Sequence, residues 1–94
     1  MKLANRSTIP VYAGVFSGNL PLDVNKRVKV TNQSGNIPSA GEGLDLPPGV
    51  YWVMMNVSGA PNKLPAGTLV GQTGGVRDTD TVVLTEDLRM VVEA

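Results

Sequence analysis

Val50-Tyr51-Trp52-Val53-Met54-Met55-Asn56-Val57 is the stretch of this 94-residue chain that most strongly favours a β-strand. It follows directly on Pro47-Pro48-Gly49, which predicts a tight turn because proline presets φ and glycine accepts a positive φ. Successive side chains of a strand point to opposite faces, so one face carries Tyr51, Val53, Met55 and Val57, and the other carries Val50, Trp52 and Met54. Both faces are apolar, whereas a sandwich strand with one face in water alternates apolar and polar residues.

Working outward, apolar residues recur with a period of two, and Gly, Pro and Asn punctuate the chain. The pattern predicts an edge strand over residues 8–16, because Pro10 cannot donate to a ladder, and a half-exposed strand over 28–32. It also predicts a short strand over 68–70 that Gly71 breaks, and a final hairpin from residues 81–84 and 88–92. We therefore expect residues 1–94 to form one all-β domain, a small antiparallel β-sandwich or jelly-roll-like barrel of about seven short strands without significant helix.

Composition excludes several functions. The chain has no Cys and no His, which removes thiol chemistry, disulfides, the Ser-His-Asp triad and ordinary zinc sites. Eight Lys and Arg balance eight Asp and Glu, so binding to nucleic acid is disfavoured. The longest apolar run, residues 50–55, is far short of the roughly 20 residues that span a bilayer, and residues 1–5 do not resemble a signal peptide. We expect a soluble non-enzymatic protein with no cofactor or metal, made in the cytoplasm of its host.

The second apolar face of residues 50–57 needs a cover, because Trp52 and Met54 in water would form a patch that soluble monomers rarely tolerate. Three explanations are open. A loop, residues 33–43 or 59–66, folds over this second face, or another copy of the chain packs on it. Alternatively, Trp52 forms the floor of a ligand pocket. The interpretation favoured from sequence is an oligomer interface made by Tyr51, Trp52, Val53, Met54 and Met55.

Residues 44–53, Leu-Asp-Leu-Pro-Pro-Gly-Val-Tyr-Trp-Val, resemble the turn and strand of C1q/tumour-necrosis-factor-like jelly-roll heads. Similar small β heads occur at the tips of bacteriophage tail fibres. The resemblance implies a homotrimer about a threefold axis, whose distal loops contact a receptor or a surface glycan. Members of that family are usually longer and carry further aromatic residues in their later strands.

Candidate binding residues are few. Lys26, Arg27 and Lys29 offer a contact for an anion or an acidic glycan, and Tyr12, together with Phe16 or Trp52, offers a ring that stacks on a sugar. The ordinary roles of these residues are a solvated strand face and core packing.

Acidic residues gather in two predicted turns. Arg77-Asp78-Thr79-Asp80 lacks the ordered oxygen ligands of a calcium loop, and we expect a solvated turn there. Glu86 and Asp87 lack the apolar setting that would raise a pKa for acid–base catalysis.

The first functional hypothesis is a non-enzymatic structural or receptor-binding β head that assembles as a homotrimer, associated with a phage or a virion. It would present loops 17–26, 33–43 and 59–66. The alternative is a small phage-type inhibitor, or a ligand-sequestering protein, that acts on a host factor.

Overall fold

The computed structural model describes residues 1–19, 26–33, 37–58 and 65–93, and this part of the chain is all-β. Its eight strands are β1 (Lys2–Asn5), β2 (Val11–Ser17), β3 (Lys29–Gln33), β4 (Glu42–Gly43), β5 (Val50–Val57), β6 (Leu69–Arg77), β7 (Thr81–Leu84) and β8 (Met90–Glu93). The predicted fold class, a small β-sandwich, is confirmed. Within the described ranges, no helix has the length and apolar character needed to cross a membrane.

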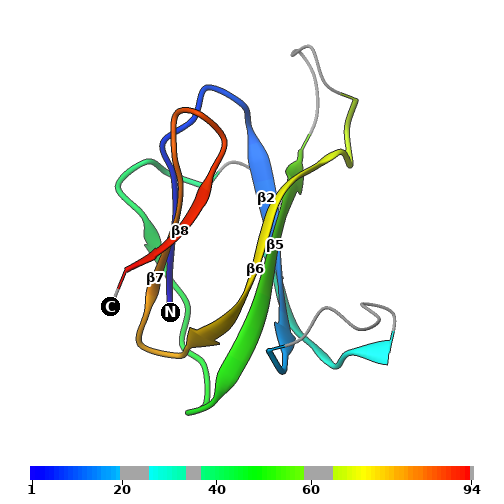
Figure 1. Cartoon of the computed structure of the whole chain (residues 1–94), viewed down its shortest axis with the longest axis vertical. Coiled ribbons are helices and arrows are strands. Elements are labelled where there is room, and N and C mark those ends of the chain that lie inside the picture. Colours follow the sequence, from blue (N-terminus) through cyan, green and yellow to red (C-terminus); the bar gives the residue numbers. More distant parts are fainter. Residues whose placement is uncertain (20–25, 34–36, 59–64, 94) are drawn as a thin grey trace.

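Two four-stranded sheets face each other (Figure 1). One sheet has the order β4-β1-β7-β8 and is called sheet A below; the other has the order β3-β2-β5-β6 and is called sheet B. Every neighbouring pair is antiparallel except β1 and β7, which run parallel with Leu3 opposite Val82. Antiparallel hairpins explain why no crossover helix is needed between most strands.

The predicted edge strand at residues 8–16 is wrong in its position. Strand β2 lies inside sheet B, hydrogen-bonded to β3 on one side and to β5 on the other. Pro10 is compatible with this place because it precedes Val11, the first residue of the ladder, and only its carbonyl is used, as acceptor for the amide of Ser58 at 2.9 Å.

Strand β6 is longer than the sequence predicts. It continues through Gly71, Gly74 and Gly75 to Arg77, with register shifts in its pairing with β5. Strand β1 was not predicted, whereas the final hairpin is confirmed as β7 and β8.

The core lies between the two sheets. Strand β5 contributes Tyr51, Val53 and Met55, and sheet A contributes Leu3, Val82 and Leu84, all of them buried. The other buried members of the cluster are Met1, Val11, Ala13, Val15, Ile37 and Val76. Because these residues alternate along their strands, each sheet keeps a second face that points away from the core.

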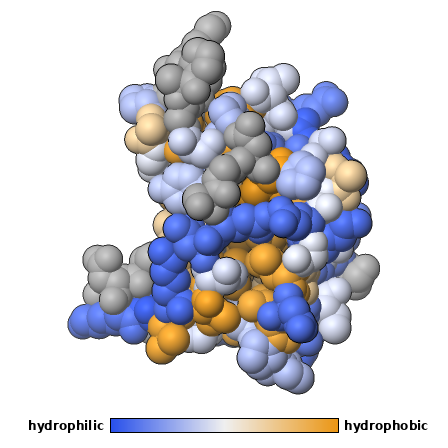
Figure 2. Space-filling view, turned by 180° about the vertical axis from the view of Figure 1, so that it is seen from behind, coloured by the Kyte–Doolittle hydropathy of each residue, from blue (hydrophilic) through white to orange (hydrophobic). Residues whose placement is uncertain are grey.

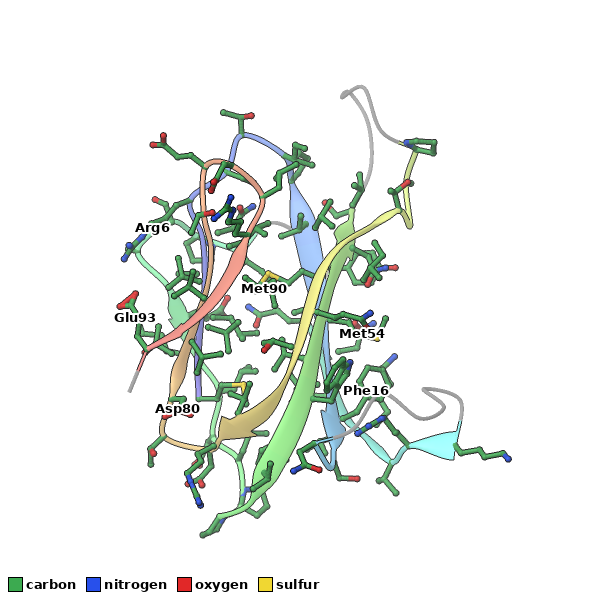
Figure 3. The ribbon with its side chains drawn as sticks, in the orientation of Figure 1. Arg6, Phe16, Met54, Asp80, Met90 and Glu93 are labelled. Carbon is green, nitrogen blue, oxygen red and sulfur yellow. The ribbon has the colours of Figure 1, made fainter. Side chains whose placement is uncertain are left out.

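Side chains join the two sheets at both edges of the sandwich. On the side nearer the viewer in Figure 1, Met90 of β8 lies between the sheets (Figure 3) and contacts Gly71 of β6, where a Cβ atom would meet the Met90 Cγ at 2.3 Å. At the opposite edge the Gln33 side-chain amide of β3 donates a hydrogen bond to the Glu42 carboxylate of β4. Figure 2 shows this opposite side, where a band of hydrophilic residues crosses apolar surface.

The adjacent residues Met54 and Met55 provide a test of this arrangement. Met55 is fully buried between the sheets, so Met55→Ala should lower the free energy of unfolding by about 2–5 kcal/mol. Met54 points to the other face and is half-buried, so Met54→Ala should cost only about 1 kcal/mol. Urea denaturation of the two variants checks the order, and equal losses would contradict the assignment of the faces.

Candidate functional site

The structure corrects the predicted oligomer interface. Tyr51, Val53 and Met55 are 5%, 0% and 0% exposed in a single chain, because sheet A covers them. The Tyr51 hydroxyl also donates a hydrogen bond to the carbonyl of Pro47 at 2.5 Å, within the turn that precedes β5. These three side chains belong to the core and are not available to a second copy.

Trp52, on the outer face of β5, is also covered by its own chain and is only 8% exposed. The Arg27 guanidinium lies over the indole, with its Cζ atom 5.4 Å from the ring centroid, in a cation–π contact. A Cβ atom at Gly74 of β6 would lie 2.2 Å from the Trp52 Cε3 atom and 2.4 Å from the Asn19 carbonyl oxygen. The indole therefore fits a slot that exists because residue 74 has no side chain.

The explanation by intrachain cover thus holds for Trp52, although the covering residues differ from those expected. Asn19 and Arg27 flank the loop whose residues 20–25 lie outside the described part of the chain, whereas the sequence pointed to 33–43 or 59–66. Arg27 is held in place by a hydrogen bond from its Nη1 atom to the carbonyl of Ser17 at 3.1 Å. Trp52 therefore needs no second copy of the chain to cover it. Of the five predicted interface residues, only Met54 is half-buried and the other four are buried.

Met54 lines a groove on the same outer face of sheet B, with a volume of about 280 Å³. The groove follows from the register of three strands. Gly14 of β2 lies opposite Met54 of β5 on one side and opposite Asn32 of β3 on the other. Because Gly14 has no side chain, the middle of this row is hollow.

Aromatic and polar side chains form the two ends of the groove. At one end Tyr12 of β2 is paired with Asn56 of β5, and at the other end Phe16 of β2 is paired with Lys29 of β3. Phe16 leans back over Gly14, since a Cβ atom there would be 2.9 Å from the Phe16 Cε2 atom. Figure 3 shows Phe16 and Met54 on the side of sheet B that faces away from the core.

The predicted ligand-contacting residues divide between two places. Tyr12 and Lys29 line the groove, and their contact with a ligand stays a prediction. Arg27 covers Trp52, and Lys26 is exposed but does not belong to the lining. Sequence reasoning missed Asn32, Met54 and Asn56 as groove residues, because only the cross-strand register brings them beside β2.

The acidic residues of the two turns make local hydrogen bonds and an exposed ion pair. Asp80 accepts a hydrogen bond from the amide of Arg77 at 2.9 Å, and Asp78 accepts one from the amide of Gly49 at 3.2 Å, so the two carboxylates cap separate backbone groups. The pKa of Asp87 is lowered, first by the hydrogen bond from the Thr85 hydroxyl and also by Arg89, whose Nε atom lies 3.3 Å away. This is the opposite of the raised pKa that a general acid needs. Among the described residues, no three Asp, Glu, His or Cys side chains gather to hold a metal.

A second hollow, of about 290 Å³, lies beside Asn5 and Ile37, and the side chains of Asn5 and Ser7 in its lining are already hydrogen-bonded. The Asn5 side chain accepts hydrogen bonds from the hydroxyl of Ser7 at 2.6 Å and from its amide at 3.0 Å, and it donates one to the carbonyl of Ile9 at 2.8 Å. This network fixes the connection between β1 and β2, so the outer groove of sheet B is the better candidate for a binding site.

Comparisons with protein-family models, with curated proteins and with solved structures gave no match. The resemblance of residues 44–53 to C1q/tumour-necrosis-factor-like heads therefore stays a prediction.

The slot around Trp52 makes Gly74 intolerant of any side chain. Gly74→Ala should displace the indole and lower the free energy of unfolding by about 1–3 kcal/mol, as overpacking does. Trp52 is the only tryptophan, so its fluorescence should also shift toward longer wavelength. Gly43→Ala is the matched control, because a Cβ atom there meets nothing within 4 Å. Unchanged emission in Gly74→Ala would show that Gly74 does not shape the slot.

Proposed function

We propose that this chain is a non-enzymatic β-sandwich binding module that contacts an acidic saccharide through the outer groove of sheet B. The observation that carries the proposal is the composition of the groove. Two aromatic residues, Tyr12 and Phe16, lie at its ends. The side-chain amides of Asn32 and Asn56 also line the groove, and Lys29 supplies a positive charge. This assigns the receptor-binding or glycan-binding role expected from sequence to a defined surface.

Each class of side chain in the groove matches one part of such a ligand. Aromatic faces contact the apolar face of a sugar ring, which carries axial C–H groups. Side-chain amides offer both donors and acceptors, as neighbouring hydroxyl groups require. Lys29 provides a charge-assisted hydrogen bond to a carboxylate or a sulfate, and none of the described residues in the lining is an Asp or Glu that would repel one.

The same inventory supports binding over catalysis. The described residues that line the groove include no carboxylate pair and no serine that could act as nucleophile. They are Tyr12, Gly14, Phe16, Lys29, Asn32, Met54 and Asn56. Its 280 Å³ are close to the low end of ligand pockets, which fits one or two sugar residues.

A groove this small and open favours use in several copies. Weak single sites gain strength when linked copies bind one surface together, so self-assembly is part of the proposed role. The threefold symmetry and the association with a phage or a virion rest on the resemblance of residues 44–53 and remain predictions. Tyr51, Val53 and Met55 cannot supply the contact, since they are core residues.

The test is an NMR titration with two disaccharides that differ in one group: a hexosamine linked to a uronic acid, and the same compound with the carboxylate reduced to an alcohol. The acidic disaccharide should shift the amide resonances of β2, β3 and β5 around Gly14. Phe16→Ala should weaken its binding at least about tenfold, as loss of an aromatic contact does. Lys29→Gln should bring the acidic and neutral disaccharides to similar affinity.

Two further variants make the result decisive. Asn32→Asp places a carboxylate in the groove at an exposed position, so it should abolish binding of the acidic disaccharide without affecting the fold. Lys2→Gln removes an exposed lysine from sheet A and should change nothing. Resonance shifts outside the groove, or equal loss in Lys2→Gln and Lys29→Gln, would contradict the proposal.

A further inference from the structure

We infer that the free edge of β8 pairs antiparallel with the β8 edge of a second copy, about a twofold axis that passes beside Val91. This inference rests on the self-assembly included in the proposed function and specifies its surface, with a twofold dimer in place of the threefold assembly that the resemblance implies. It places the contact on sheet A, at the opposite side of the sandwich from the saccharide groove. Sheet A of one copy would then continue into sheet A of the other.

Among the edge strands of the described structure, β8 is the least protected against pairing. Edge strands are protected by charges, glycines, bulges or shortness. Strand β3 carries an exposed lysine and a register shift, β4 has two residues, and β6 contains three glycines and two register shifts. Strand β8, Met-Val-Val-Glu, is also short and ends in a charge, but it pairs with β7 in unbroken register and contains no Gly, Pro or Lys. The charge of Glu93 faces an opposite charge, that of Arg89, in the pairing described below.

Strand β8 also exposes apolar surface at this edge. Val91 and Val92 are 42% and 38% exposed. Val91 also lies in register with Val83 of β7 and Ala4 of β1, so it ends an apolar row across the outer face of sheet A. Val83 and Ala4 are already buried, and pairing at β8 would extend that row into the second copy.

The backbone of β8 presents the right groups for such a pair. The amide of Thr85 donates to the carbonyl of Arg89 at 2.9 Å, so Arg89 directs its backbone groups toward β7. In an antiparallel ladder the direction alternates, which turns Val91 toward β7 as well and leaves the N–H and C=O groups of Met90 and Val92 at the free edge. A twofold axis beside Val91 sets Met90 opposite Val92 of the other copy, and these two residues can exchange both hydrogen bonds.

Charges fix this register. With Val91 opposite its own counterpart, Arg89 lies opposite Glu93 of the second copy, and the symmetry repeats the pair. Residues 89, 91 and 93 share the outer face of the sheet, so the opposite charges are direct cross-strand neighbours. Figure 3 shows Glu93 projecting from this outer side. The ion pair that Arg89 makes with Asp87 is exposed, with 79% and 66% of the two side chains accessible, and it is weak enough to exchange.

Charge reversal of the full chain tests the inference, with sedimentation equilibrium as the measurement. The natural chain should form a dimer, and Arg89→Glu or Glu93→Arg should each weaken it at least about tenfold, because like charges then face each other twice. An equimolar mixture of the two variants should restore the dimer, since each Glu again faces an Arg. Arg6→Glu, an exposed reversal on the same sheet but away from β8, is the control and should leave the dimer intact.

Three results would overturn the inference: a natural chain that stays monomeric, a trimeric mass, or a mixture no tighter than either variant alone. Circular dichroism of each variant shows that the fold persists.

Failure of this inference differs from failure of the proposed function. The dimer-weakened variants should still bind the acidic disaccharide at one site per chain, and Asn32→Asp should lose the disaccharide while remaining dimeric.

Discussion

The structure depends on one constraint, the need to cover both faces of β5. The inner face of β5 is covered as in other β-sandwiches, because the second sheet packs on it. Sheet A supplies Leu3, Val82 and Leu84 to this contact, and β5 supplies Tyr51, Val53 and Met55. The outer face of β5 is covered at Trp52 without a third layer of secondary structure. The side chain of Arg27, which precedes β3, and a glycine of β6 enclose the indole of Trp52, so the largest apolar group of sheet B is removed from water within a single copy.

Two glycines give the outer face of sheet B its shape. Gly74 admits the Trp52 ring against the backbone, which fills one end of the face. Gly14 lies at the centre of the row that joins Asn32 and Met54, and its missing side chain leaves a hollow that Phe16 only partly covers. The same sheet therefore has a closed half that stabilises the fold and an open half available to a ligand. A substitution that fills the hollow would act on binding, whereas one that fills the slot would act on stability.

Much of the fold could be predicted from sequence because its signals are local. The apolar run of β5 and the β7–β8 hairpin both lie within short segments. The tight turn predicted at Pro47-Pro48-Gly49 is not formed as expected, because Gly49 is not among the glycines with positive φ. Strand β1 was missed because its partner β7 is distant in sequence and four residues show little alternation. Strand β6 was misjudged because Gly71 and Gly74 usually interrupt strands, yet here they permit the close approach of Met90 and Trp52.

The candidate site could be predicted only in part. Tyr12 and Lys29 stood out by residue type, and the register then brought them together with Asn32 and Asn56. The sequence cannot say whether a second apolar face is covered by the same chain or by another, since both satisfy the same hydrophobic requirement. Arg27 shows the difficulty, because its charge indicated a ligand while its position makes it a cover for Trp52.

The most direct test of this account is the emission of Trp52 over a dilution series, from about 100 µM to about 0.1 µM, where mass action separates weak oligomers. Intrachain cover predicts emission at short wavelength and weak quenching by acrylamide that stay constant throughout, even as the sedimentation coefficient falls. A shift to longer wavelength and stronger quenching on dilution, in a chain that remains folded, would show that a second copy covers the indole and would contradict the account.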